Sequence, residues 1–236
     1  MKTKLIVALD VAGIEEARAL LDKLCPVVDI FKVGSQLFTA CGPAVVDEVH
    51  KRGARAFLDL KFHDIPNTVE GAVRSATRLG VFMLNVHIQG GIRMMQKAKE
   101  AAFDESKKSG KPKPIVLGVT VLTSMDQKDL SDIEIRKGVK QQVTYLAKLA
   151  KQAGLDGVVA SAQEIQAIKW TCGDDFLVVT PGIRPAWAGS DDQRRSTTPA
   201  EAVKSGADYM VVGRPILKAE DQAAAAKKII GEINGQ

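Results

Sequence analysis

Eight short apolar segments rich in β-branched residues recur along the chain, and the intervals between most of them leave room for a helix. They cover residues 5–9, 27–33, 56–60, 81–86, 115–121, 157–160, 176–179 and 209–212. Apolar residues recur at helical spacing in segments 15–24, 69–79, 92–106, 139–153, 162–170 and 198–205. Strands that alternate with helices indicate a parallel sheet, and eight such units predict one α/β domain over residues 1–236, a (β/α)8 TIM barrel. An open doubly wound sheet is the alternative.

Glycine commonly follows the expected helices. The positions are Gly53, Gly80, Gly110, Gly154, Gly173 and Gly206. A left-handed residue at the C-terminal end of a helix is usually glycine, so we expect these residues to end helices.

Composition narrows the classes of function. A chain of 236 residues with 45% hydrophobic and 26% charged residues can build one large core. Only five apolar residues precede Asp10, too few for a signal peptide, and no later run could span a membrane. We therefore expect a cytoplasmic protein with no membrane contact. A net charge of +5 is weak for binding nucleic acid but suits an anionic small molecule.

Cysteine and histidine give no sign of a metal or redox site. The cysteines are Cys25, Cys41 and Cys172, which are scattered and have no motif spacing. His50 and His63 lack suitably spaced partners, and we expect His87 to be a hydrogen-bonded residue at a strand end. The sequence predicts neither a metal nor a cofactor.

Polar side chains lie at the carboxyl ends of the expected strands, where barrels of this kind carry their chemistry. They are Asp10, Lys32, Asp59, Lys61, Asn85, His87, Thr120, Thr123, Ser161, Arg184 and Arg214. The opposite strand ends show no such consistency. This convergence predicts an active site at the carboxyl ends.

Apolar and charged residues alternate through the third expected strand, so Asp59 and Lys61 should project from one face. If Asp10 and Lys32 also point inward, the site holds two cations and two anions. An ammonium group among carboxylates suits a reaction that develops negative charge on carbon and then needs a proton. A buried ion network that only supports the fold is the structural alternative.

The residues after this strand bring a third acid, Asp64. Ile65-Pro66 then forces extended backbone before a helix that Asn67 or Thr68 can cap. The stiff step makes an outward reach of Asp64 plausible.

The last two strand exits have the composition of a phosphate site. Pro181 and Arg184 follow the seventh strand, and Gly213 and Arg214 follow the eighth. Barrels often bind phosphate between these loops, and paired arginines suit a dianion. The polar loop 185–199 between them is either a lid or a plain surface loop.

Segment 59–69, which reads DLKFHDIPNTV, resembles the signature of the bacterial-type orotidine 5'-phosphate decarboxylase family. Other segments resemble the family in the same order along the chain: VALD (7–10), FKVG (31–34), VTVLTSM (119–125), TPGIR (180–184), DQRR (192–195) and VGRP (212–215). The resemblance implies a cofactor-free homodimer that converts orotidine 5'-phosphate to UMP and CO2, the last step of de novo UMP biosynthesis.

The resemblance also implies roles for individual residues. Lys61 would donate a proton to C6 of the pyrimidine, within a network of Lys32, Asp59, Lys61 and the partner subunit's Asp64. Asp10 and Lys32 would hold the ribose, Thr68 would reach the partner's site, and Thr123 would lie near the substrate. Arg184, Gln193, Gly213 and Arg214 would bind the phosphate. Ile65 and Pro181 complete the expected substrate-binding set.

Two other functions stay open on the sequence alone. A related decarboxylase acting on 3-keto-L-gulonate 6-phosphate shares the Asp-x-Lys-x-x-Asp core but uses Mg2+. Segment 64–68 and the DQR of 192–194 favour the nucleotide substrate. A catalytically silent nucleotide-binding barrel is the third interpretation, and the presence of both lysines and all three acids speaks against it.

Overall fold

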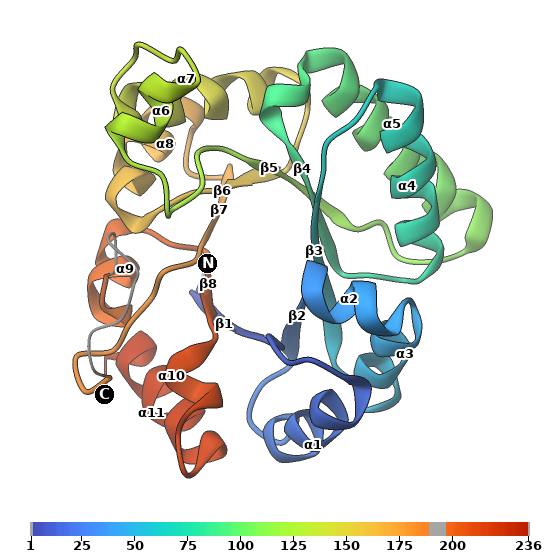
Figure 1. The fold of residues 1–236 in the computed structure, drawn as a ribbon, viewed down its shortest axis with the longest axis vertical. Helices are drawn as coiled ribbons and strands as arrows, with labels where there is room; N and C mark the ends of the chain where they lie inside the picture. The colour runs from blue at the N-terminus through green and yellow to red at the C-terminus, as the bar shows by residue number, and fades with distance from the viewer. Residues whose placement is uncertain (1, 189–196, 236) are drawn as a thin grey trace.

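The computed structural model describes residues 2–188 and 197–235 and shows a closed barrel of eight parallel strands surrounded by helices (Figure 1). The strands are β1 (Lys4–Ala8), β2 (Ile30–Gly34), β3 (Arg55–Phe62), β4 (Met83–His87), β5 (Ile115–Val119), β6 (Gly157–Val159), β7 (Leu177–Thr180) and β8 (Tyr209–Val212). They pair in chain order, and β8 closes on β1. The predicted (β/α)8 barrel is confirmed, and the open sheet is excluded.

Helices cover the outside of the barrel. They are α1 (Ile14–Leu24), α2 (Ser35–Cys41), α3 (Ala44–Lys51), α4 (Pro66–Arg78), α5 (Ile92–Ser109), α6 (Gln127–Asp132), α7 (Val139–Gln152), α8 (Ile165–Cys172), α9 (Pro199–Ser205), α10 (Arg214–Leu217) and α11 (Gln222–Asn234), with 3-10 turns η1 (Ile88–Gly90) and η2 (Ala162–Glu164). Every expected helical segment is helical, although segment 162–170 divides into η2 and α8. The six expected glycines all have positive φ, between 67° and 95°.

One helix begins earlier than expected. The first residue of α4 is Pro66, and Ile65 is its N-cap residue without a side-chain hydrogen bond. The prediction that Asn67 or Thr68 caps this helix is therefore wrong. Proline is favoured in the first helical turn because its fixed φ suits the helix and its missing N–H needs no partner there. Only residues 63–65 are left to connect β3 to α4.

Side chains alternate between the inside and the outside of the barrel. The interior is filled by Ile6, Ala8, Ile30, Phe57, Met83, Leu117, Val179, Tyr209 and Val211. Their outward neighbours Val7, Phe31 and Leu58 belong to the larger core beneath the helices. Lys32 and Asp59 follow Ile30 and Phe57 by two residues, so they share the inward direction. The apolar interior is thus capped by charged groups at the carboxyl ends of the strands.

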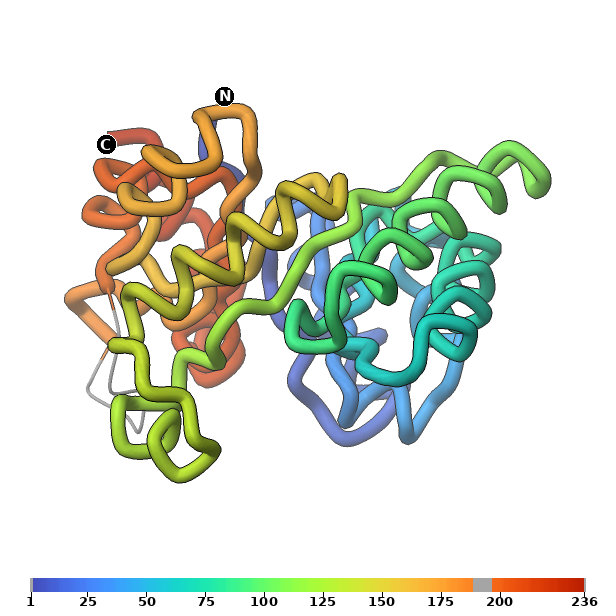
Figure 2. Tube along the Cα trace, turned by 90° about the horizontal axis from the view of Figure 1, so that it is seen from above, coloured from blue at the N-terminus to red at the C-terminus, as the bar shows by residue number. Residues whose placement is uncertain are grey.

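The two ends of the chain and the carboxyl ends of the strands lie on opposite sides of the barrel (Figure 2). In the view of Figure 2, both ends of the chain lie on one side, and Thr3 and Asn234 line a common hollow there. The strands point toward the other side, where α6 lies.

Within the described residues, no helix is both long and apolar enough to cross a membrane.

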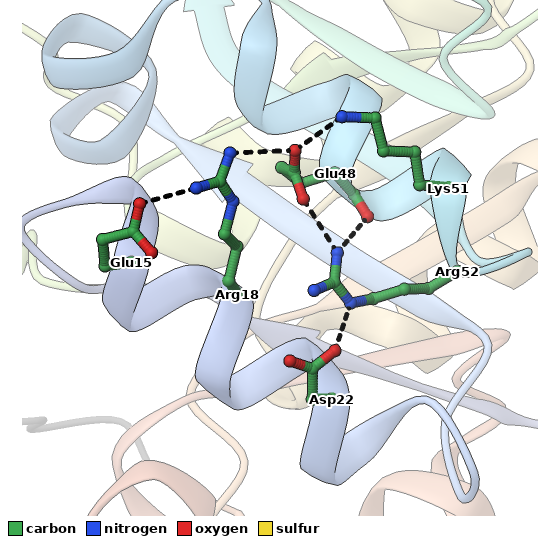
Figure 3. A network of polar contacts seen from close by, with 6 residues as sticks. All are labelled: Glu15, Arg18, Asp22, Glu48, Lys51 and Arg52. Atoms are coloured by element: carbon green, nitrogen blue, oxygen red, sulfur yellow. Dashed lines mark hydrogen bonds and ion pairs between the residues drawn. The ribbon is translucent and has the colours of Figure 1, made fainter.

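An ion network joins α1 to α3 on the outside of the barrel (Figure 3). Glu48 on α3 is only 6% exposed and lies at its centre. Its carboxylate contacts Arg18 of α1 at 3.2 Å, Lys51 at 2.8 Å and Arg52 at 2.9 Å. Arg52 also contacts Asp22 of α1 at 2.7 Å. The hydrogen bonds that the Glu48 carboxylate accepts from Arg18, Lys51 and Arg52, that from Arg18 above all, lower the pKa of Glu48 to about 2.

Acid should weaken this ion network, because the Glu48 carboxylate that holds it is then protonated. Because the folded-state pKa of Glu48 lies below its ordinary 4.5, its stabilising contribution is complete above about pH 5 and is lost as the pH falls toward 2. Glu48→Gln should lower the thermal midpoint of unfolding by several degrees at pH 7. In this variant the midpoint should also fall less steeply as the pH decreases from about 5 toward 2. Thermal unfolding from pH 7 to 2.5 measures both effects. Glu220→Gln, at an exposed position, is the matched control and should change neither.

Candidate active site

A cavity of about 200 Å³ opens at the carboxyl ends of the strands. Five of the expected residues line it: Lys32, Asp59, Lys61, Thr123 and Pro181. Its other walls are mostly apolar and include Phe57, Val119, Val159 and Val211. A larger hollow, about 720 Å³, lies at the amino ends of the strands and is lined by none of the expected residues. The smaller cavity is therefore the one at which residues predicted from the sequence gather.

Four charged side chains form a row of alternating sign across this site, and we call it the charge row: Asp10, Lys32, Asp59 and Lys61. Lys32 Nζ lies 3.0 Å from Asp10 Oδ1 and 3.5 Å from Asp59 Oδ2. Lys61 Nζ lies 2.7 Å from Asp59 Oδ1. The Lys32 and Asp59 side chains are 12% exposed, whereas that of Lys61 is 34% exposed. The inner pair is thus fixed and shielded, and the Lys61 ammonium is accessible to a ligand.

Lys61 reaches this position through an irregular strand rather than through simple alternation. Its φ is +52°, outside the β region. The pairing of β3 with β4 shifts register between Leu58 and Phe62. The expectation that Asp59 and Lys61 lie together is met in distance, but strand periodicity alone does not account for it.

A second cavity, about 240 Å³, lies beyond strands β7 and β8. Both expected arginines, Arg184 and Arg214, line it together with Trp187, Pro215 and Lys218. Gly213 lies beside the charge row, since a Cβ built on it would be 3.3 Å from Asp10 Oδ2. The expected ribose and phosphate positions are therefore neighbours. Gln193 lies outside the described residues.

The remaining expected residues lie on the exposed connection after β3. Asp64 accepts a hydrogen bond from the backbone N–H of Ile65 at 2.6 Å. Ile65 is 66% exposed, and Thr68 is also exposed. Among the described residues, none of these three lines the 200 Å³ cavity of its own chain. The structure of one chain brings Asp10, Lys32, Asp59 and Lys61 together and leaves Asp64 apart.

His87 follows this site on β4, where its ring lies 5.4 Å from that of His63. Burial lowers the pKa of His87, and the nearby His63 and Lys61 lower it further, so the imidazole is neutral at pH 7. His87 ends β4 as expected, but its Nδ1 is buried and has no hydrogen-bond partner among the described residues, so this nitrogen does not take the expected hydrogen-bonded role. Residues 2–188 and 197–235 contain no group of three or more His, Cys, Asp or Glu side chains that could hold a metal.

Comparison with known proteins decides the family. The model of the orotidine 5'-phosphate decarboxylase / HUMPS family matches residues 3–229. The chain belongs to this family. Two curated relatives bear the name orotidine 5'-phosphate decarboxylase. The protein from Moorella thermoacetica is 53% identical to this chain, and the protein from Syntrophomonas wolfei is 52% identical to it. These matches cover 98% of the chain and 92% and 97% of the two relatives.

Solved structures agree with this membership of the orotidine 5'-phosphate decarboxylase / HUMPS family. A crystal structure of orotidine 5'-phosphate decarboxylase from Lactobacillus acidophilus superposes with a TM-score of 0.86 and 39% identity. It covers 98% of this chain and 99% of the other. The resemblance inferred from the sequence motifs is confirmed.

Three further side chains lie at the 200 Å³ cavity or contact the charge row. Leu122 and Ser124 line the 200 Å³ cavity on either side of Thr123, within a segment already quoted for the resemblance. Asn85 was noted only as a polar strand end, yet it contacts both Asp59 and Lys61. Asn85 follows Met83 by two residues on the same strand, and Met83 lies in the barrel interior. Strand alternation therefore predicts that Asn85 also points inward.

Proposed function

We propose that this chain catalyses the cofactor-independent decarboxylation of orotidine 5'-phosphate to UMP and CO2, the last step of de novo UMP biosynthesis. The observation that carries the proposal is the alternating row from Asp10 to Lys61 in a barrel whose curated relatives bear this enzyme's name. The reaction belongs to the cytoplasm, where we expect the protein.

The proposed chemistry takes place at C6 of the pyrimidine. The bond from C6 to the carboxylate breaks, CO2 leaves, and the electron pair stays on carbon. A carbanion at this position has little resonance stabilisation, so a fixed ammonium beside it lowers the barrier more than it stabilises the bound substrate. Lys61 supplies that charge and then transfers a proton from Nζ to C6. Solvent water returns the proton to Lys61.

The acids of the row have two tasks. Asp59 holds the Lys61 ammonium at 2.7 Å, which fixes the direction of the proton donor. Asp59 also lies where the substrate carboxylate would approach, and two unit charges about 4 Å apart repel by about 4 kcal/mol at an effective dielectric constant of about 20. Departure of neutral CO2 relieves this repulsion. Lys32, between Asp10 and Asp59, keeps the row balanced and, with Asp10, holds the ribose.

The phosphate end supplies binding energy away from the reacting carbon. Arg184 and Arg214 line one cavity, and an arginine fork can bind a phosphate dianion through two parallel hydrogen bonds. In this proposal Gly213 and Pro181 contact the substrate between its ribose and its phosphate, and Thr123 lies beside the base. We also assign Gln193 to the phosphate on the resemblance alone.

The test is direct. Purified protein is incubated with orotidine 5'-phosphate and excess EDTA, and loss of orotate absorbance is followed while UMP is identified chromatographically. UMP formation at an EDTA-independent rate supports the proposal. Turnover that requires added Mg2+, or that occurs only with 3-keto-L-gulonate 6-phosphate, assigns the chain to the sugar-phosphate branch. Binding of UMP without turnover of either substrate indicates a silent nucleotide-binding barrel.

We further propose that the protein acts as a homodimer and that Asp64 completes the site of the partner subunit, with Ile65 and Thr68 beside it. In its own chain, Asp64 is exposed and hydrogen-bonds to the backbone of Ile65. Ile65 presents a large apolar side chain to solvent beside it. A partner that covers this connection would bury the isoleucine and receive the carboxylate.

Subunit exchange tests this arrangement. Asp64→Ala and Lys61→Ala should each be nearly inactive, but a two-fold dimer gives the same residue in both directions. In the mixed dimer one site receives both defects and the other receives neither, so activity should return to about one intact site per dimer. Mixing Lys32→Ala with Lys61→Ala is the control and should restore nothing, because both residues serve their own chain. Verified mixed dimers without activity would place Asp64 in its own site.

A further inference from the structure

Asn85 occupies the middle of β4 and is completely buried. Both ends of its side-chain amide are bonded within the charge row. Nδ2 donates a hydrogen bond to Asp59 Oδ1 at 2.6 Å, and Oδ1 accepts one from the backbone N–H of Lys61 at 2.8 Å. The same Asp59 oxygen accepts the hydrogen bond from Lys61 Nζ at 2.7 Å. One neutral amide therefore contacts both the acid and the backbone of the cation.

The register of the sheet explains why a side chain is needed at this point. Leu58 pairs with Leu84, and the next pair is Phe62 with Val86. Four residue steps on β3 thus face two on β4. The extra residues interrupt the regular ladder, and Lys61 lies within them at positive φ. Within this irregular stretch the backbone N–H of Lys61 donates to the side-chain Oδ1 of Asn85.

We propose that Asn85 is a positioning residue that sets the Asp59 carboxylate and the Lys61 ammonium in register with the reacting carbon. This inference deepens the proposed function and rests on it. An amide is suited to the task because it donates to a carboxylate without adding a charge to the row. A cation would neutralise Asp59, and a second carboxylate would repel it.

The surroundings of Asn85 limit which groups could otherwise respond to pH. The titratable groups facing it are Asp59 and Lys61 on β3 and His87 two residues along β4. Its partner on β5 is Leu117, and β5 reads IVLGV, which brings no titratable side chain. A new pH dependence in a variant with a carboxyl at this position therefore belongs to that carboxyl and Asp59 as a coupled pair.

The decisive variant is Asn85→Asp, which preserves shape. The introduced carboxyl, when protonated, can still donate to Asp59 and accept from Lys61; when ionised, it repels Asp59. The ratio of kcat in this variant to kcat in the parent should fall about tenfold per pH unit above the pKa of the introduced carboxyl. Asn85→Leu cannot make either bond, and its kcat should be about 100-fold lower at every pH.

A structural role alone would not produce this pattern. KM and the affinity for UMP should change little in both variants, because the ribose and phosphate contacts are untouched. The measured kcat of each variant is normalised to the fraction of protein that binds UMP. Thr77→Val is the matched control, since Thr77 is fully buried on α4 and hydrogen-bonds to Val73. It should lower stability without changing kcat or its pH profile.

Two results would overturn the inference while leaving the function intact: a parental kcat in the UMP-binding fraction of Asn85→Leu, or a parental kcat in Asn85→Asp at pH values where the introduced carboxyl is ionised. Absence of UMP formation by the parent chain would instead reject the proposed function. The two failures are thus distinguishable in one set of assays.

Discussion

Replacement of Lys61 by alanine is expected to lower kcat/KM for orotidine 5'-phosphate by at least about four orders of magnitude. The change removes the charge beside the developing carbanion and the proton donor together. Electrostatic stabilisation alone is worth about 10²–10³-fold and general acid catalysis about 10²–10⁴-fold. Separate kcat and KM values assign the loss to the chemical step if it falls mainly on kcat.

The fold should survive this substitution, because the Lys61 side chain is one-third exposed and lies at the end of its strand. UMP binding by the Lys61→Ala protein checks that the site is still assembled. Lys107→Ala, in the last turn of α5, is the matched lysine control and should have parental activity. A Lys61→Ala enzyme within tenfold of the parent would contradict the assigned role.

Arg214→Ala should lower kcat/KM on the nucleotide by about two to four orders of magnitude. A charge-assisted hydrogen bond contributes about 1.5–3 kcal/mol, and an arginine fork on phosphate makes two. The binding energy reaches the chemistry by fixing the substrate over the charge row. Orotidine, which lacks the phosphate, should be turned over slowly and almost equally by both enzymes.

Lys218 provides the comparison for this prediction. It lines the same cavity as Arg184 and Arg214 but carries a point charge rather than a fork. Lys218→Ala should therefore cost much less than Arg214→Ala. Equal losses on nucleotide and nucleoside in the Arg214→Ala enzyme would show that the arginine supports the fold instead of the phosphate.

The architecture could be predicted because its signals are local. Apolar runs mark the strands, and glycines such as Gly110 and Gly206 mark helix ends with left-handed backbone. Helices α2, α3, α6 and α10 lie outside the expected segments. They have seven, eight, six and four residues, so their periodic signal is weak. Helix α11 was missed although it is longer, because its first half is mostly alanine and contrasts little in polarity.

The site could be predicted only in part. Lys32 and Asp59 follow from strand alternation, which is a property of one segment. The position of Lys61 depends on a register shift and on Asn85 from the next strand, and neither is visible in the third strand by itself. The proposed role of Asp64 requires a second chain. Information that joins segments or subunits is not contained in the periodicity of either one.

The left-handed backbone of Lys61 has a consequence for the evolution of the enzyme. A non-glycine residue at φ +52° costs about 1 kcal/mol or more, a cost that glycine would avoid. The chain therefore gives up folding free energy at the position of its proposed proton donor. Selection for thermostability alone would favour replacing this lysine, and selection for UMP synthesis would oppose it. Thermostability and activity therefore make opposite demands on residue 61. Searches for more thermostable variants should keep Lys61 unchanged.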